Sequence, residues 1–155
     1  MKNPFMARAI KLAIENVRVR GGGPFAALVL KDGEVISDGA NCVTSTNDPT
    51  AHAEVMAIRK ACGILGVFEL RGCDIYTSCE PCPMCLGAIY WARPERVFFA
   101  CTSADASKAG FDDSLIYQEL TLAHARRKIP LISMMRDEAL EVFRAWEDKN
   151  DKIPY

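Results

Sequence analysis

Two short segments of the chain carry residue types that bind metal ions. One is HAE at residues 52–54 and the other is PCPMC at residues 81–85. Pro83 suits the first position of a helix, which makes Cys82 the N-cap and Cys85 the third helical residue. These two positions are neighbours, and the unpaired N–H groups at a helix start favour thiolates. Together with His52 they predict a site for one zinc ion with three protein ligands.

A zinc site with three protein ligands keeps its fourth tetrahedral position open, as catalytic sites do for water. Two thiolates and a neutral imidazole cancel the +2 charge of zinc, so the ion activates water less strongly than a three-histidine site. A nearby carboxylate must then take and relay the proton, and Glu54 lies two residues from His52. The order H-x-E followed by P-C-x-x-C is the signature of zinc deaminases. The sequence therefore predicts an enzyme with Glu54 as the catalytic residue.

Cys79 leaves two other interpretations of the cysteine cluster open. As a fourth ligand it would close the site, and the chain would then be a non-catalytic, zinc-stabilised interaction domain. That hypothesis leaves Glu54 without a role, and Cys79 falls at the end of an expected strand. An iron–sulfur cluster would need a further cysteine after three residues, but residue 89 is isoleucine.

Composition limits the class of protein. The 155 residues fit one domain, half of them are hydrophobic, and the net charge of −1 makes nucleic acid an unlikely partner. Apolar runs are far shorter than the ~20 residues that span a bilayer, so no membrane is expected. The seven cysteines, an odd number without a secretory signal, indicate a cytoplasmic protein with free thiols.

The hydrophobic pattern predicts an α/β fold: three layers, α/β/α, around a five-stranded mixed sheet. The expected helices begin near Pro4, Asp48-Pro49, Pro83, Ser114 and Asp137. The expected strands are Phe25–Leu30, Val35–Asp38, Asp74–Ser78, Arg96–Cys101 and Leu131–Met135. Residues 147–155 would form a C-terminal tail of the single domain.

Over nearly its whole length the chain resembles the cytidine/deoxycytidylate deaminase superfamily. Three stretches resemble the bacterial guanine deaminases closely: NDPTAHAEVMAIRKAC (47–62), YTSCEPCPMCLGAIYWAR (76–93) and AGFDDSLIY (109–117). The tRNA adenosine deaminases share the core of the first two. The third discriminates between these families, because its acidic pair resembles the guanine enzymes. The resemblance implies hydrolysis of guanine to xanthine and ammonia, with a tRNA adenosine deaminase or another nucleobase or nucleoside deaminase as the alternative.

The resemblance also implies roles for individual residues. His52, Cys82 and Cys85 match the zinc ligands, and Glu54 matches the proton-shuttling carboxylate. Asn41 matches an amide that contacts the purine, and Asp113 a carboxylate at the ring edge that carries the amino group. The family's homodimers exchange C-terminal segments, so that Tyr155 would reach the neighbour's pocket.

Simpler structural roles remain open for four of these residues. Asn41 can be a turn residue, and Asp113 can be part of a solvated loop or a helix cap before Ser114. Phe25 can be a core residue, although a flat purine favours an aromatic wall and Phe25 follows a glycine-rich loop. Tyr155 can be an isolated aromatic residue at a solvated end.

Overall fold

The computed structural model describes residues 3–19 and 21–155. The chain divides into two compact units, one ending at Asp113 and the other comprising Ser114–Tyr155. Within the described residues, no helix is long and apolar enough to cross a membrane.

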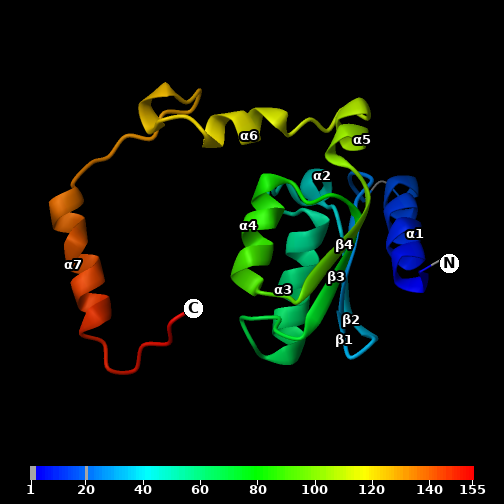
Figure 1. Cartoon of the computed structure of the whole chain (residues 1–155), viewed down its shortest axis with the longest axis horizontal. Coiled ribbons are helices and arrows are strands. Elements are labelled where there is room, and N and C mark those ends of the chain that lie inside the picture. The colour runs from blue at the N-terminus through cyan, green and yellow to red at the C-terminus, as the bar shows by residue number, and fades with distance from the viewer. Residues whose placement is uncertain (1–2, 20) are drawn as a thin grey trace. The chain divides into compact units, whose positions relative to one another are not determined.

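The first unit is built on a mixed four-stranded sheet in the order β2-β1-β3-β4 (Figure 1). The strands are β1 (Ala26–Lys31), β2 (Glu34–Ala40), β3 (Cys73–Cys79) and β4 (Arg96–Cys101). β1 pairs antiparallel with β2 and β3, and β3 pairs parallel with β4. A two-residue turn joins β1 to β2; Asp32 and Gly33 both have positive φ there, which matches the right-handed twist of a hairpin.

Helices cover both faces of this sheet, which confirms the expected α/β/α layers (Figure 1). α1 (Pro4–Arg18) lies on one face, while α3 (Ala53–Leu65) and α4 (Pro83–Ala92) lie on the other. Side chains alternate along β3: Ile75 packs in the core beneath α3 and α4, and Tyr76 in the core beneath α1.

α3 lies unusually close to β2, and a glycine makes this possible. A Cβ on Gly39 would meet the carbonyl oxygen of Ala53 at 2.4 Å and the amide nitrogen of Ala57 at 2.5 Å. The glycine therefore lets the first turn of α3 rest directly on the sheet. That turn carries His52 and Glu54.

The expected start of α3 at Asp48-Pro49 was wrong. The Asp48 carboxylate accepts hydrogen bonds from the backbone N–H and the hydroxyl of Thr50, both within its own turn. Asp48 therefore closes an Asx-turn instead of capping a helix. The helix begins later, with His52 as its N-cap.

Two short helices of the first unit were not anticipated. α2 (Val43–Thr46) is a single turn after Asn41. α5 (Ser103–Lys108) begins with a capping box between Thr102 and Asp105. The T-x-x-D spacing is a sequence signal that could have located α5.

The second unit contains α6 (Ser114–Leu120), a short 3-10 helix η1 (His124–Arg126) and α7 (Arg136–Glu147). The expected strand Leu131–Met135 is absent, so the predicted five-stranded sheet is corrected to four. Its apolar sequence resembles a buried strand, yet Ile132 is 81% exposed and Met135 has left-handed φ. A strand needs a paired neighbour, and this unit contains no other strand.

Candidate metal centre and active site

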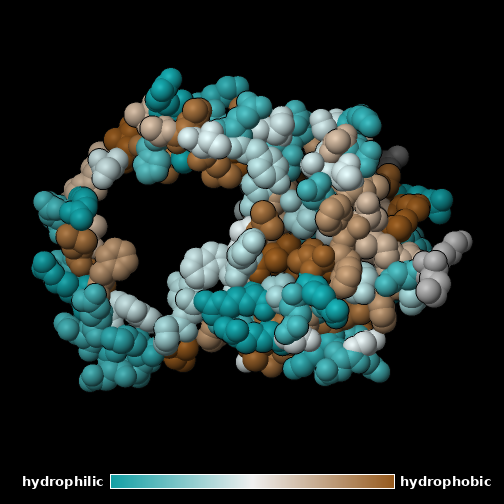
Figure 2. Space-filling model, viewed as in Figure 1, coloured by the Kyte–Doolittle hydropathy of each residue, from teal (hydrophilic) through white to brown (hydrophobic). Residues whose placement is uncertain are grey.

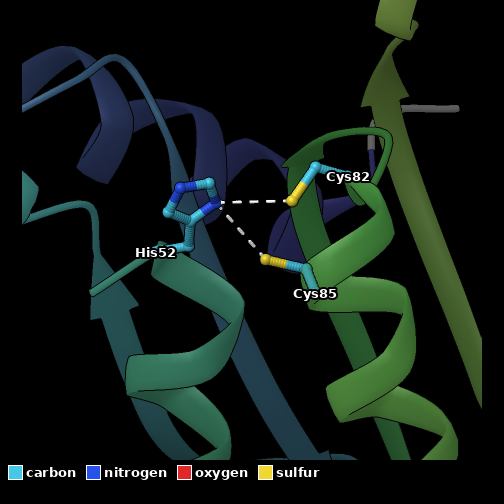
Figure 3. Close-up of side chains that lie close together, drawn as sticks. All are labelled: His52, Cys82 and Cys85. Carbon is cyan, nitrogen blue, oxygen red and sulfur yellow. Dashed lines mark hydrogen bonds between the residues drawn. The ribbon is translucent and has the colours of Figure 1, made fainter. Parts of the chain in front are cut away.

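Two helix starts bring the three expected metal ligands together. His52 is the N-cap of α3 and Cys82 the N-cap of α4, with Pro83 at the first helical position and Cys85 at the third. Figure 3 shows the imidazole of His52 pointing across to both thiols. The neighbouring positions of Cys82 and Cys85 on one helix start, predicted from the proline spacing, are therefore confirmed.

The distances between the three side chains fit a tetrahedral zinc ion. Nδ1 of His52 lies 3.5 Å from Sγ of Cys82 and 3.5 Å from Sγ of Cys85. All three ligand atoms lie within 4.8 Å of one another. Zinc bonds of ordinary length at tetrahedral angles place nitrogen and sulfur about 3.5 Å apart. A soft ion with one imidazole and two thiolates therefore fits the space between them.

The two thiols have opposite pKa shifts. The interaction with Cys85 lowers the pKa of Cys82 well below its ordinary value, and the same interaction raises the pKa of Cys85. The hydrogen bond with Cys82 raises the pKa of His52 above its ordinary value. Because zinc binds thiolates, metal binding must displace the proton that this coupling retains on Cys85.

Glu54 lies beside the ligands, on the first turn of α3, and is only 6% exposed. Its Oε1 accepts a hydrogen bond from the Thr77 hydroxyl at 3.2 Å, and its Oε2 accepts one from Sγ of Cys85 at 3.4 Å. Burial raises the pKa of this carboxyl. A buried acid with a raised pKa beside three residues that could hold a metal is suited to proton transfer.

Cys79 takes no part in this cluster. Its Sγ donates to the carbonyl oxygen of Thr102 at 3.6 Å, and burial raises its pKa to about 11. Among the described residues, the group able to hold a metal consists of His52, Cys82 and Cys85. A neutral thiol with its own backbone partner gives no support to a closed four-ligand site.

Asn41 is buried directly after β2, where it holds the glycine-rich loop. Its side-chain oxygen accepts hydrogen bonds from the backbone N–H of Gly23 at 3.1 Å and of Val43 at 3.3 Å. Its carbonyl oxygen accepts from Nδ2 of Asn16 at 2.8 Å. Gly22 must be glycine there, because a Cβ would lie 2.1 Å from that carbonyl oxygen. The turn role considered from sequence is thus present; whether Asn41 also contacts a purine stays a prediction.

Phe25 and Asp113 are far apart in the sequence of the first unit. The ring of Phe25 meets the ring of Phe111 edge to face, with 4.9 Å between centroids, so the loop after α5 reaches the start of β1. Asp113 is half-buried in that loop, whereas Asp112 is exposed. Burial raises the pKa of Asp113, and the negative charge of Cys82 raises it further.

Sequence reasoning missed Phe111 and Thr77, since neither residue type suggests a site by itself. Phe111 precedes the acidic pair in AGFDDSLIY, and that position was its one available signal. Tyr155 belongs to the second unit and is 74% exposed, so its predicted role at a neighbour's pocket stays a prediction.

Comparison with known proteins identifies the family. The model of the cytidine and deoxycytidylate deaminase zinc-binding region matches residues 1–101. The chain belongs to this deaminase family. The deaminase is 54% identical to guanine deaminase of Bacillus subtilis over 97% of each chain. It is 34% identical to the tRNA-specific adenosine deaminase of the same organism, over 74% of this chain and 71% of that one.

A solved structure extends the similarity to the whole fold. The crystal structure of guanine deaminase from Bacillus subtilis superposes with a TM-score of 0.97 at 53% identity, covering 100% of this chain and 99% of that one. The family and the ligand set together establish a zinc-dependent hydrolytic deaminase.

Proposed function

We propose that this deaminase converts guanine and water to xanthine and ammonia. Guanine is assigned as the substrate on the 54% identity to a guanine deaminase across 97% of both chains. The similarity to the tRNA enzyme has a lower identity and covers a smaller share of the chain. The balanced charge of the chain, −1 overall, also provides no general attraction for a tRNA backbone. We assign the enzyme to the cytoplasm, because the described cysteines are all free thiols.

In this proposal, Glu54 carries the protons. When held by His52, Cys82 and Cys85, zinc supplies a Lewis acid that activates water at neutral pH. Glu54 takes a proton from the water that attacks C2 of the purine. It then delivers protons to the ring nitrogen and to the leaving amine, and ammonia departs. Its burial and its contact with Cys85 support this role, since the carboxyl is shielded from solvent and lies beside a residue that would hold the metal.

Three further side chains select the base in this proposal. Asp113 accepts hydrogen bonds from the N–H edge of guanine, where adenine offers no matching donors. Asn41 contacts the purine with its amide, and Phe25 provides an aromatic wall with Phe111 behind it. The edge-to-face contact of the two rings supports this, because it holds the loop of Asp113 close to Phe25.

The first test measures ammonia release from guanine, guanosine, adenine, cytosine and a tRNA substrate. The proposal expects xanthine from guanine and little product from the others; cytosine or tRNA as the best substrate would overturn it. Glu54→Gln should retain zinc and lower turnover by ~10²–10⁴-fold, because it removes the proton carrier without removing a ligand. Turnover within a few-fold of the wild type would contradict the mechanism.

The second test compares the two acids of the GFDDS loop. Asp113→Asn should lower kcat/KM for guanine by ~10²-fold while zinc content and melting temperature stay close to wild type, because a charge-assisted contact to substrate is lost. Asp112→Asn is the matched control and should have a small effect. The opposite ranking would mean that the substrate contact is assigned to the wrong acid.

We further propose that the whole chain, residues 1–155, acts as one catalytic domain within a homodimer. Residues 131–155 of one chain would associate with the first unit of a second copy, with 147–155 as the exchanged tail. The first unit has a surface for such a segment, a groove of about 360 Å³ between α1 and β4. Its lining is largely apolar and includes Ile10, Ile14, Val17 and Cys101.

The apolar residues of the second unit support the same arrangement. Figure 2 shows hydrophobic (brown) residues at its surface. Its exposed large apolar side chains include Ile132, Phe143 and Ile153. Light scattering on the purified chain should give the mass of a dimer, and Ile132→Lys should shift it towards monomer. A wild-type monomer with full activity would exclude the exchange.

A further inference from the structure

Thr77 is a polar residue on an apolar face of the sheet. Its side chain is on the same side of β3 as Cys73 and Ile75, which belong to the core beneath α3 and α4. Backbone pairing with Ala27 on β1 and Phe99 on β4 fixes its position, and it is 1% exposed. A buried hydroxyl at such a position costs free energy unless it has a hydrogen-bond partner.

The partner of Thr77 is the carboxylate of Glu54. The Thr77 hydroxyl donates to Oε1 at 3.2 Å, and Oε2 lies 3.4 Å from Sγ of Cys85. The two oxygens therefore have different surroundings: Oε1 is directed at the sheet and Oε2 at the ligand cluster. The terminal torsion of a glutamate is soft, so contacts to its oxygens decide how the carboxylate is turned.

We propose that Thr77 is a positioning residue for the reaction: its hydroxyl holds Oε1 of Glu54 and leaves Oε2 to exchange protons at the metal side. The inference rests on the proposed function, in which Glu54 is the proton carrier. Thr77 touches neither ligand nor substrate in this assignment. It acts on the rate of proton transfer and leaves metal binding and substrate binding unchanged.

The test distinguishes the contribution of the Thr77 hydroxyl from the contribution of the side chain's shape. Thr77→Val keeps the shape and should lower kcat about tenfold with KM within about twofold of wild type, because a misplaced catalytic group slows the chemical step. Zinc content should remain one ion per chain. Thr77→Ser restores the hydroxyl and should recover most of the lost kcat. If Thr77→Val fails to fold, Thr77→Ser and Thr77→Ala, which differ by the hydroxyl alone, serve as the same comparison.

A neighbouring hydroxyl supplies the control for general destabilisation. Oγ of Ser78 accepts a hydrogen bond from the backbone N–H of Ala26 at 3.0 Å, on the other face of β3. Ser78→Ala should lower the melting temperature with kcat unchanged. An equal fall in kcat for Ser78→Ala and Thr77→Val, or loss of zinc from Thr77→Val, would show a structural role and overturn the inference.

Measurement of Glu54→Gln beside these variants distinguishes the two proposals. If Glu54→Gln is inactive while Thr77→Val equals wild type, the role of Thr77 is wrong and the proposed mechanism stands. If Glu54→Gln remains active, the acid–base role of Glu54 fails, and the role of Thr77 fails with it. In the double variant, Thr77→Val should add no loss to that of Glu54→Gln, because both changes act on one carboxylate.

Discussion

The two units of the chain differ in how far they bury their apolar side chains. Up to Asp113, β1 and β3 bury nearly every residue, and helices pack on both faces of the sheet. In Ser114–Tyr155, none of the helices contains a buried residue, and large apolar side chains such as Ile132 and Phe143 are exposed. The first unit forms a core that can hold a rigid metal site. The second exposes large apolar side chains and has no buried core of its own, which indicates an association surface.

The largest expected effect lies in the first unit and concerns the metal. Cys82→Ala should abolish zinc binding and turnover together, because two remaining ligands hold zinc far more weakly than three. Elemental analysis of the purified chain measures the loss. Cys79→Ala is the matched control and should keep its zinc, since Cys79 is bonded to a backbone carbonyl. Zinc depletion in that control would favour a closed, structural site.

The second-largest expected effect comes from a deletion in the second unit, which should lower turnover without changing metal binding. Deletion of residues 152–155 should leave zinc content and melting temperature nearly unchanged, because these residues are exposed. Turnover of guanine should fall at least about tenfold if Tyr155 closes a neighbour's pocket and excludes water.

Subunit mixing tests whether that tail acts on another chain. The truncated chain mixed with full-length Glu54→Gln should regain activity, since a mixed dimer combines an intact metal site with a tail from its partner. Dimer exchange can be followed with two differently tagged chains. Normal turnover by the truncated enzyme alone would contradict the role of the tail, and exchange without rescue would assign the tail to its own subunit.

The same contrast explains which parts of the structure could be predicted from sequence. In the first unit, α4 begins where Pro83 predicts, and the turn after β1 forms at Asp32-Gly33, because local chemistry and tertiary packing agree there. At Asp48 two local interactions compete, and the Asx-turn prevails over the helix cap. The expected strand at Leu131–Met135 failed because an apolar run specifies burial without specifying the surface that buries it.

Within the candidate site, the sequence predicted the residues whose positions follow from their spacing along one helix. It missed the residues that are defined by contacts between segments far apart in the chain. The N-cap and third-residue positions of Cys82 and Cys85 follow from helix geometry alone. The contact of Thr77 with Glu54 joins a strand to a helix 23 positions away in the chain, and no local pattern marks it. The contact between the rings of Phe111 and Phe25 also joins distant segments, and no local pattern marks it.

The smallest expected effect concerns the contribution of ion pairs to the stability of each unit. Asp38 on β2 bonds to Lys60 on α3 at 2.8 Å and to Arg8 on α1 at 3.1 Å, so it links both helical layers to the sheet. In the second unit, the pairs Arg136–Asp137 and Arg144–Glu141 join residues one and three positions apart. An ion pair within one helix adds little to tertiary stability, whereas Asp38 ties separate elements together.

The pH dependence of stability should reveal this difference. The hydrogen bond from Lys60 lowers the pKa of Asp38 below 3.8, its value in the unfolded chain. Well above pH 3.8 the carboxylate is ionised in both states, and the folded state retains the full stabilisation. As the pH falls through 3.8 towards the lower folded pKa, the unfolded chain takes up the proton first and the stabilisation is lost.

Asp38→Asn should therefore lower the free energy of unfolding near neutral pH by about 0.5 kcal/mol, a small value because these pairs are partly exposed. The difference from wild type should shrink as the pH falls below 3.8 and vanish below the lowered folded pKa, where Asp38 is protonated in both states. Urea unfolding of the metal-free full chain measures both values without interference from zinc release. Glu141→Gln is the control in the second unit and should leave the unfolding of the first unaltered at every pH. An equal effect of the two substitutions would mean that the units unfold as one cooperative body, and the contrast between a self-sufficient and a dependent unit would not hold.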